Sequence, residues 1–299
     1  MPAETSQGRV LSHRSGGDIA VRMGEETLRC RARGLLRGDV LPGDLVTVRR
    51  EADGMGTVLT VLSRKNRLIR PAVSNVDRLL LVVSAAPPVT DRRFIDGMCA
   101  MAAYMGTMPV ILLNKCDEDP GTELRAVLSA AGYRVIPCSA RTGEGIPEIT
   151  DLLRDGTVVF AGNSGVGKSS LLQHFLPSEA IRTDELSRRI GRGKNTTRHV
   201  TFYPCEFGAL VCDTPGFSTF DPVEMGMTDP DRLVDCFPEF GPHIGGCRWG
   251  DCAHTTEQGC AVLAAVERGE IDRERHQNYV GFWHQLKEFD RTNYGKADH

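Results

Sequence analysis

The feature that most constrains this chain is the glycine-rich motif Gly162-Asn-Ser-Gly-Val-Gly-Lys-Ser169. Its spacing matches G-x-x-x-x-G-K-[ST], in which backbone N–H groups and the start of the following helix face phosphate oxygens. Lys168 is predicted to reach the β- and γ-phosphates, and Ser169 to bind Mg²⁺. The flanking sequences GTVVFA and SLLQHFL predict a strand before the loop and a helix after it, so the chain needs an α/β sheet to carry the motif.

Strands and helices are predicted to alternate ahead of this loop. Continuous apolar runs at 77–87, 108–117 and 133–140 are typical of strands that are buried on both faces. Residues 94–106 and 122–132 have helical spacing. This alternation predicts a parallel sheet covered by helices.

The amino-terminal part predicts a different architecture. Residues 9–62 read as about five short strands separated by turns such as Ser15-Gly-Gly-Asp18. This pattern fits a small barrel such as an OB-fold, and an SH3-like barrel would look similar. Residues 1–70 hold 13 Lys and Arg against 8 Asp and Glu, whereas the remaining residues hold 23 against 31. A basic module on an acidic body indicates either a polyanionic partner or an ordinary solvated surface.

A second motif distinguishes between nucleotides. Asn114-Lys-Cys-Asp117 follows an apolar strand, at the sheet edge where open α/β proteins bind ligands. Asp117 can accept hydrogen bonds from the N1–H and the exocyclic amine of guanine, a pair of donors that adenine lacks. Asn114 would tie the loop to its neighbours, Lys115 would lie along the base, and the N–H of Ala140 in Ser139-Ala140 would donate to guanine O6. The motif therefore predicts GTP rather than ATP.

Two further segments have the composition of switch loops. Asp213-Thr-Pro-Gly216 follows a strand, so Asp213 can hold Mg²⁺ through water and the Gly216 N–H can contact the γ-phosphate. Thr197, in the loop GRGKNTTRH, is predicted to close over Mg²⁺. No Gln or Glu follows at 217–220 to orient the attacking water, so intrinsic hydrolysis should be slow. His199 is the candidate that positions the water, and a surface histidine is the alternative.

The order of these motifs is itself informative. In Ras-like GTPases the phosphate loop comes first, followed by switch one, switch two, the guanine motif and Ser-Ala. Here the motifs at 114 and 139 precede the phosphate loop at 162 and the switch segments at 197 and 213. Because the cyclic order is kept and only the chain break has moved, the sequence predicts a circularly permuted GTPase domain.

The ten cysteines fall into two groups. Cys247-x4-Cys252-x-His254-x5-Cys260 offers three thiolates and one imidazole, a closed tetrahedral set for one structural zinc ion, with free buried cysteines as the alternative. The others stand singly, Cys236 among them, and six lie within or beside apolar runs, where small buried hydrophobes are expected rather than disulfides. These six are Cys30, Cys99, Cys116, Cys138, Cys205 and Cys212.

The amino terminus is polar and shows no secretory signal, and no run of 18 apolar residues predicts a membrane span. We expect a cytoplasmic, monomeric protein without membrane contact. The predicted domains are an OB-fold domain at 1–66, a GTPase domain at 67–220 and a zinc-binding domain at 221–299.

Together these motifs resemble the ribosome-small-subunit-dependent GTPase A family, RsgA, also called YjeQ. The resemblance covers nearly the whole chain and includes RKNRLIRP, NVDRLLLVVSAAPP, NKCD, the phosphate loop, TTRHV, DTPGF and the Cys/His site. It implies an α/β P-loop GTPase domain, circularly permuted, between an N-terminal all-β OB-like barrel and a small helical zinc-binding domain. His199 matches the switch histidine that the family uses for hydrolysis, and Phe217 stands where other GTPases have Gln. Asn195 departs from the His that is common in the family.

The resemblance further implies a GTPase of late 30S ribosomal subunit maturation that binds 16S rRNA and hydrolyses GTP faster on the subunit than alone. Its cofactors would be GTP/GDP, Mg²⁺ and one structural Zn²⁺. The expected catalytic residues are Lys168 and His199, and the expected Mg²⁺ ligands are Ser169, Thr197 and Asp213. The expected nucleotide-binding residues are Asn114, Lys115, Cys116, Asp117, Ser139, Ala140, Gly162, Asn163, Ser164, Gly165, Val166, Gly167, Lys168, Ser169, Ser170, Thr197, Asp213 and Gly216.

Two other functions compete with this one. The chain could be an RNA-binding checkpoint module in which GTP only sets affinity and hydrolysis is incidental. It could also be a metabolic kinase or ATPase built on the phosphate loop, although Asn114-Lys-Cys-Asp117 speaks against adenine.

Overall fold

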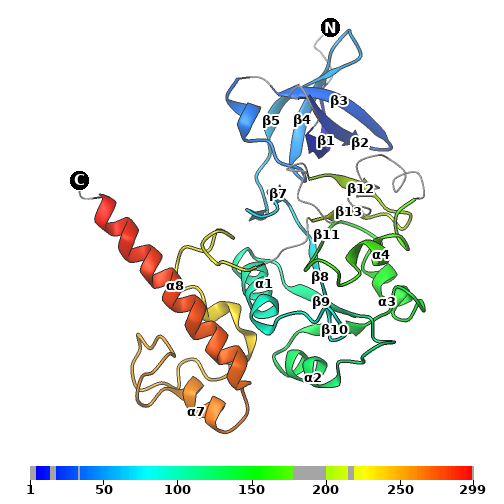
Figure 1. Ribbon diagram of the computed structural model, residues 1–299. Helices are drawn as coiled ribbons and strands as arrows, with labels where there is room; N and C mark the ends of the chain where they lie inside the picture. Colours follow the sequence, from blue (N-terminus) through cyan, green and yellow to red (C-terminus); the bar gives the residue numbers. More distant parts are fainter. Residues whose placement is uncertain (1–4, 14–17, 33, 178–199, 215–218, 298–299) are drawn as a thin grey trace. The chain divides into compact units, whose positions relative to one another are not determined.

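The computed structural model describes residues 5–13, 18–32, 34–177, 200–214 and 219–297 (Figure 1). The chain divides into two compact units. The first unit comprises Met1–Leu79, Ile146–Ala161 and Lys168–Gly216, and the second comprises Leu80–Gly145, Gly162–Gly167 and Phe217–His299. None of the helices in the described ranges has the length and apolar character needed to cross a membrane.

The first unit contains a closed five-stranded barrel with the strand order β1-β2-β3-β5-β4, drawn in blue in Figure 1. β3 pairs with β5 in parallel, with Cys30 opposite Gly56, and the other neighbouring strands are antiparallel. This is the arrangement of an OB-fold, so the predicted barrel is confirmed and the SH3-like alternative is set aside. Its elements are β1 Thr5–His13, β2 Asp18–Met23, β3 Glu26–Ala32, η1 Gly34–Gly38, β4 Leu45–Arg50 and β5 Gly56–Val61.

Alternation along the strands builds the barrel core. In β3, Leu28, Cys30 and Ala32 point inward and are buried, whereas Arg29 and Arg31 between them are exposed. Apolar side chains from all five strands and from the segment after η1 meet in this interior. Its buried members are Val10, Ile19, Val21, Leu28, Cys30, Ala32, Val40, Val46, Val48 and Val58.

A six-stranded sheet with the order β10-β9-β8-β11-β13-β12 follows the barrel. β9 pairs with β10 and β11 pairs with β13 in parallel, whereas β12 is antiparallel to β13. Every residue of β11 and β13 is buried. Of the strands predicted from continuous apolar runs, β8 and β9 are buried at all but one residue each, whereas β10 is buried only at Ile136. The strands are β8 Arg78–Ser84, β9 Pro109–Asn114, β10 Arg134–Pro137, β11 Thr157–Gly162, β12 Phe202–Pro204 and β13 Leu210–Asp213, and a separate two-stranded sheet consists of β6 Arg67–Leu68 and β7 Val73–Ser74.

Helices alternate with these strands, which confirms the α/β prediction. The first begins where the Asp91 carboxylate accepts the backbone N–H of Phe94 at 3.0 Å and so caps the free end of the helix. Short helices follow β10 and the phosphate loop. They are α1 Arg92–Tyr104, α2 Thr122–Ala130, α3 Ile146–Asp151 and α4 Lys168–Leu172.

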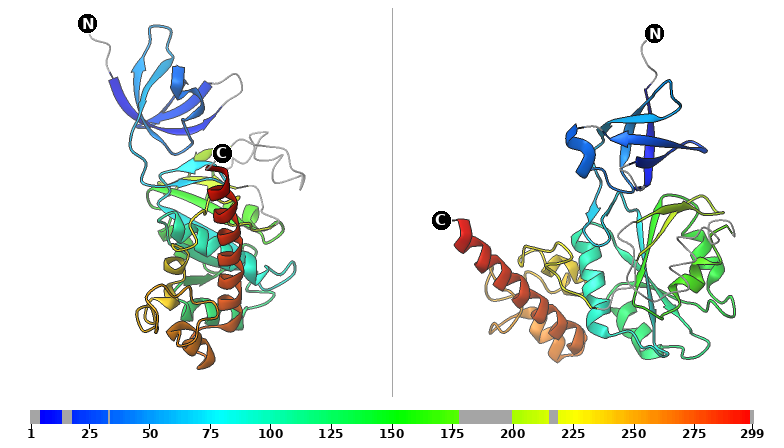
Figure 2. Two further views of the ribbon diagram at one scale, coloured as in Figure 1. Left: turned by 90° about the vertical axis from the view of Figure 1, so that its left-hand side faces the viewer. Right: turned by 45° about the horizontal axis from the view of Figure 1, so that its top comes forward.

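The C-terminal part of the second unit contains a longer helix than the sequence pattern indicated. α8, Arg273–Ala297, has 25 residues and is the red helix that runs diagonally in Figure 1 and vertically in the left view of Figure 2. Tyr279, Phe282 and Leu286 form its buried stripe, spaced three and four residues apart. Smaller elements precede it, namely η2 Val234–Cys236, η3 Pro238–Phe240 and α7 Ala261–Glu267.

α8 packs along α1, and a phenylalanine from the segment after β13 lies in their seam. The Phe220 ring meets the Phe282 ring edge-on at 5.2 Å between centroids. It also lies directly against Gly97 of α1, where an added Cβ would overlap the ring. About two turns before Phe282 on α8, the fully buried Arg275 forms ion pairs with Asp96 and Glu239. The seam is therefore tightly packed, and its buried arginine is paired with carboxylates.

Candidate functional site

The phosphate loop occupies the predicted position between β11 and α4. Gly162 has φ +154° and Gly167 has φ +88°, which side chains rarely adopt. A Cβ at 162 would overlap the carbonyl oxygen of Val82, and a Cβ at 167 would overlap the side-chain amide of Asn114. Glycine is thus required at both positions, because the loop backbone runs directly against its neighbours.

Asn114, at the end of β9, joins three of the predicted motifs. Its Nδ2 donates to the carbonyl oxygen of Val166 in the phosphate loop at 2.8 Å. Its Oδ1 accepts the backbone N–H of Ala140 at 3.1 Å. The side chain is 1% exposed, so both hydrogen bonds are shielded from water. The expected tie between the guanine motif and its neighbours is therefore present in the structure.

The next two residues of the motif are also held in place. Lys115 has φ +63° and its Nζ donates to the carbonyl oxygen of Pro87 at 2.6 Å. The backbone N–H of Cys116 donates to the carbonyl oxygen of Cys138 at 3.1 Å, which connects the ends of β9 and β10. The loop that would face a base is thus fixed at its backbone.

Asp117 is surrounded by donors. Hydrogen bonds from the Ser139 hydroxyl and then from the Arg141 guanidinium lower the pKa of the Asp117 carboxyl, so it is ionised at neutral pH. Arg141 Nε lies 2.7 Å from Oδ2, and Nη2 contacts the same oxygen. The sequence analysis missed Arg141, although its position directly after Ser139-Ala140 placed it beside the motif.

In the first unit, Lys168 forms an ion pair with Asp213 at the end of β13 and also donates to the carbonyl oxygen of Thr214. The side chains of Lys168 and Asp213 are each 8% exposed. A buried lysine and a buried carboxylate neutralise each other, which is the condition for either charge to remain there. The structure thus brings together the two residues predicted to contact phosphate and Mg²⁺.

Two buried oxygens in the described part of the site have no hydrogen-bond partner, Asn163 Oδ1 in the phosphate loop and Thr214 Oγ1 after β13. Buried polar atoms are normally satisfied, so each is suited to bind a ligand or water. Ser164 and Ser170 are exposed, and Ser169 is half-buried at the start of α4. The predicted Thr197, His199 and Gly216 lie outside the described residues.

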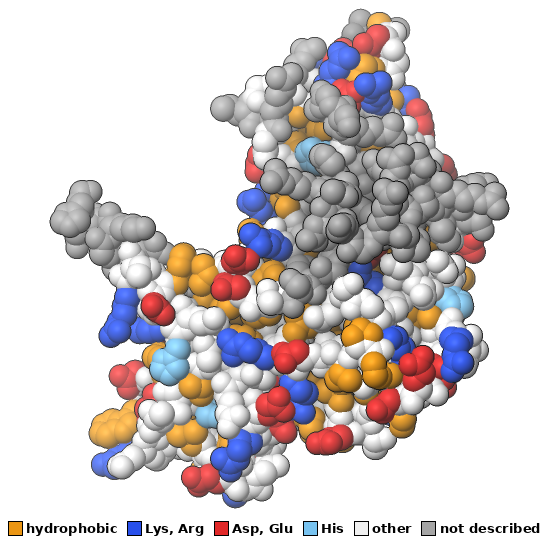
Figure 3. All heavy atoms as spheres, viewed as in Figure 1, with side chains coloured by type: hydrophobic (Ala, Val, Ile, Leu, Met, Phe, Trp, Pro, Cys, Tyr) orange, Lys and Arg blue, Asp and Glu red, His pale blue; other side chains and the backbone are white. Residues whose placement is uncertain are grey.

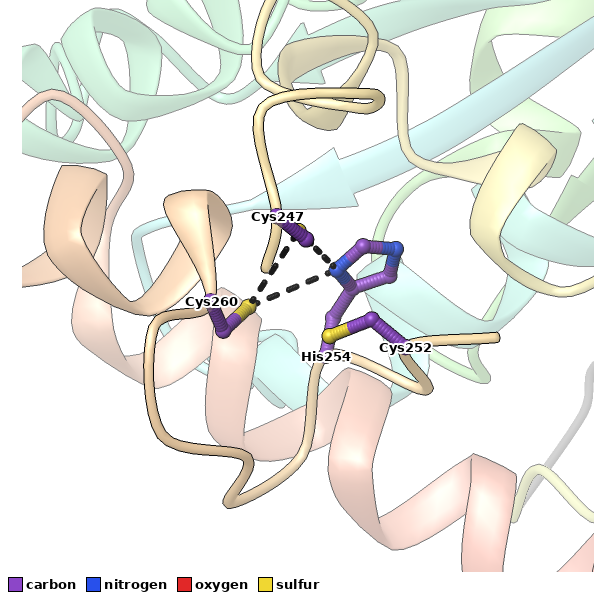
Figure 4. Close-up of side chains that lie close together, drawn as sticks. All are labelled: Cys247, Cys252, His254 and Cys260. Atoms are coloured by element: carbon purple, nitrogen blue, oxygen red, sulfur yellow. Dashed lines mark hydrogen bonds between the residues drawn. The ribbon is translucent and has the colours of Figure 1, made fainter. Parts of the chain in front are cut away.

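The second unit also contains the predicted metal site. Cys247, Cys252, His254 and Cys260 converge in Figure 4, and their ligand atoms all lie within 4.8 Å of one another. Cys247 Sγ lies 3.9 Å from Cys260 Sγ, and His254 Nδ1 lies 3.5 and 3.4 Å from these two sulfurs. A tetrahedral zinc ion with normal bond lengths requires edges of about 3.8 Å between sulfurs and about 3.6 Å between sulfur and nitrogen. The four residues therefore fit zinc.

Hydrogen bonds from the surrounding residues stabilise and orient the metal-binding residues. The N–H groups of Ala261 and Leu263 point at the sulfurs of Cys247 and Cys260, at 3.3 and 3.5 Å, which stabilises thiolates. Burial lowers the pKa of His254, so its imidazole is neutral as a ligand must be. Two side chains of α8 hold the loop that carries the ligands: the His276 ring hydrogen-bonds to the carbonyl oxygen of His254, and the Tyr279 hydroxyl donates to the carbonyl oxygen of Ala253.

The remaining cysteines follow the sequence expectation with one exception. Cys116 is half-buried, whereas the other cysteines outside the metal site are buried. These buried ones are Cys30, Cys99, Cys138, Cys205, Cys212 and Cys236.

Comparison with known proteins agrees with this geometry. Residues 61–223 match the family model for the RsgA GTPase. The chain is similar to the small ribosomal subunit biogenesis GTPase RsgA of Caldanaerobacter subterraneus subsp. tengcongensis, with 37% identity over 97% of this chain and 99% of the relative. It is 36% identical to the protein of the same name from Bacillus velezensis, over 94% of this chain and 98% of that protein.

Two solved structures share the fold. YjeQ from Thermotoga maritima superimposes with a TM-score of 0.76 at 33% identity, covering 95% of this chain and 99% of the other. YloQ, described as a circularly permuted GTPase, has a TM-score of 0.76 at 29% identity and covers 95% of this chain and 96% of its own. The permuted order predicted from the motifs is thereby confirmed.

Proposed function

Because the chain belongs to the RsgA GTPase family and is therefore a GTP hydrolase, we propose that it acts in late maturation of the small ribosomal subunit. It would bind 16S rRNA as a monomer in the cytoplasm, hydrolyse GTP faster on the subunit, and then dissociate. The observation that supports the proposed guanine-nucleotide site is the Asn114 bridge, since it joins the base motif to the phosphate loop.

The base would be recognised by the loops after β9 and β10. Asp117 is ionised and can accept from guanine N1–H and the exocyclic amine. Ala140 N–H, which donates to Asn114 Oδ1 in the structure, would have to turn to guanine O6 when the base binds, and it would disfavour adenine because adenine carries an amine there. These contacts favour a guanine nucleotide over the kinase or ATPase alternative.

The phosphates would be held by the loop at 162–169 and by the start of α4. Lys168 would leave Asp213 for the β- and γ-phosphates, and Asp213 would then face the metal together with Ser169 and Thr197. Bound Mg²⁺ would neutralise charge on the β- and γ-oxygens. Thr214 Oγ1, which has no hydrogen-bond partner, belongs to the residue whose carbonyl oxygen accepts from Lys168.

Hydrolysis would depend on His199 and on the subunit. Nothing at 217–220 supplies a Gln or Glu to orient water, so we assign that role to His199. Docking on the subunit would hold His199 and the attacking water in line, and a partner that completes such a site raises the rate by about 10³ to 10⁵ in other P-loop GTPases.

The barrel would supply contacts to rRNA. Arg29 and Arg31 project from the outer face of β3 and are 60% and 63% exposed. Lys and Arg side chains are visible on the barrel at the top of Figure 3, where acidic side chains lie among them. Both arginines form ion pairs with Asp18 in the structure, and they would have to exchange that carboxylate for phosphate oxygens to contact a nucleic-acid backbone. The proposed domains remain 1–66, 67–220 and 221–299, with zinc holding the last.

The proposal is tested by GTP turnover with and without small ribosomal subunits at one salt concentration, because phosphate contacts weaken as salt rises. Stimulation by small but not large subunits is the expected result. Turnover that the small subunit leaves unchanged would exclude the activation mechanism. The checkpoint alternative gains support if a His199→Ala protein, inactive in hydrolysis, still allows normal maturation and release.

A further inference from the structure

Arg141 has no role in the proposed recognition or hydrolysis of GTP, yet it contacts the residue on which base recognition depends. Its Nε lies 2.7 Å from Asp117 Oδ2, and its Nη2 contacts the same oxygen. We infer that Arg141 is an internal competitor of guanine, which occupies Asp117 while the site is empty and withdraws when the base binds. The inference rests on the proposed role of Asp117 as the guanine reader.

Arg141 and guanine would offer Asp117 the same kind of hydrogen-bond donors. A guanidinium presents parallel N–H donors in a planar fork, and guanine presents a similar fork through N1–H and the exocyclic amine. Both pairs of N–H groups can donate to the two oxygens of a carboxylate. Guanine needs both oxygens of Asp117, so Arg141 has to release Oδ2 before the base can be held in full.

The other donor to Asp117 is held in place by its own turn. The Ser139 hydroxyl hydrogen-bonds to the carboxylate, and Ser139 Oγ is itself held by the backbone N–H groups of Arg141 and Thr142 at 3.2 and 3.1 Å. The carboxylate is 11% exposed, so solvent reaches it only in part. With Ser139 fixed in the turn, Arg141 is the partner that can leave.

Arg141 can leave without moving the backbone. Its side chain is 72% exposed, whereas its turn is closed by hydrogen bonds from Gly143 N–H to Ser139 O at 2.9 Å and from Ser139 N–H to Glu144 O at 3.0 Å. The hydrogen bond to Asp117 raises the pKa of the Arg141 guanidinium, and the neighbouring exposed Glu118 adds a smaller electrostatic attraction. A released Arg141 therefore has both water and a second carboxylate to turn to.

The test compares GDP affinity of the full-length protein with that of Arg141→Ala, by equilibrium titration in one low-salt Mg²⁺ buffer. An exposed ion pair competes weakly, so Arg141→Ala should bind GDP about 1.5- to 5-fold more tightly. Arg141→Lys, which keeps a cation but loses the planar fork, should lie between the two. The matched control is Arg154→Ala, which removes a comparably exposed arginine paired with Asp151 and should leave GDP affinity unchanged.

A second background separates this inference from the proposed function. Asp117→Asn removes the anion that Arg141 contacts and should shift preference from guanine to xanthine nucleotides. In that background Arg141→Ala should leave the affinity for xanthosine diphosphate unchanged. If Asp117→Asn does not shift the preference, the base assignment itself fails. If it does, but Arg141→Ala leaves GDP affinity unchanged or weaker, Arg141 is no competitor and this inference is overturned.

Discussion

Asn114 and Val166 are 52 residues apart in the chain, yet the side-chain amide of Asn114 donates to the Val166 carbonyl at 2.8 Å. The same amide group accepts the N–H of Ala140 at 3.1 Å. One buried side chain thus joins the guanine motif, the Ser-Ala turn and the phosphate loop. A permuted chain keeps these motifs in contact although it reverses which of them comes first.

Replacing this bridge should weaken nucleotide binding as well as stability. Asn114→Ala leaves the Val166 carbonyl and the Ala140 N–H without their partner, at about 1–3 kcal/mol for each buried group. We expect a lower melting temperature and GDP affinity reduced by about tenfold or more. The control is Asn278→Ala, which removes a 2.8 Å hydrogen bond to Asp96 away from the site and should lower stability alone. Equal GDP affinity in the two variants would contradict the bridging role.

Asp213, which pairs with Lys168 in the structure, is the proposed Mg²⁺ ligand, so replacing it should change how nucleotide binding depends on magnesium. Asp213→Asn removes the charge that would hold Mg²⁺ but leaves the phosphate loop intact. GTP affinity in Mg²⁺ should fall by about tenfold to a hundredfold, whereas affinity in excess chelator should stay close to that of the unaltered protein. Titrations with and without Mg²⁺ check this. An equal loss under both conditions would show that Asp213 does not act through the metal.

Metal removal should affect the C-terminal elements selectively. The purified protein should contain one zinc ion per chain, and a strong chelator should release it and lower the melting temperature, because folding and zinc binding are coupled. Cys252→Ser should have the same effect while GDP binding persists. Cys236→Ser, which alters a buried cysteine outside the metal site, should retain the zinc. Full zinc content in Cys252→Ser would argue against the four-ligand site.

The packing between α1 and α8 predicts that replacing a helical glycine by alanine lowers the stability of this protein, the opposite of the usual effect. Gly→Ala inside a helix normally stabilises by about 0.5–1 kcal/mol, but at Gly97 the added methyl would overlap the Phe220 ring. Gly97→Ala should therefore destabilise the protein by about 1–3 kcal/mol. In a Phe220→Ala background the same change should become stabilising, which denaturant unfolding of the four proteins can measure. Additive effects would show that the two residues do not meet.

The sequence predicted most of the motifs whose residues follow one another at a characteristic spacing. The phosphate loop, Asn114 through Asp117 and the four Cys/His ligands needed only short-range chemistry, so their positions were recognisable without a structure. The length of α8 was missed, since its buried stripe of Tyr279, Phe282 and Leu286 is sparse among polar residues.

The side-chain partners depend on tertiary contacts, which no spacing reveals. The buried pair of Lys168 with Asp213 brings together residues 45 positions apart, and the pairing of Arg141 with Asp117 spans 24. Both place a cation of the chain on a carboxylate that the motifs assigned to nucleotide or metal. Motifs identify what a residue can bind, whereas only the fold shows which internal group occupies it beforehand.

The most direct measurement of the central claim is the base preference of Asp117→Asn, by comparing hydrolysis of GTP and of xanthosine triphosphate with that of the unaltered protein. An asparagine reverses one hydrogen bond of the base-reading pair, and xanthine supplies the matching oxygen in place of the exocyclic amine. The account predicts that the variant loses activity on GTP and gains it on xanthosine triphosphate. Unchanged preference for GTP would contradict the placement of the guanine base at Asp117.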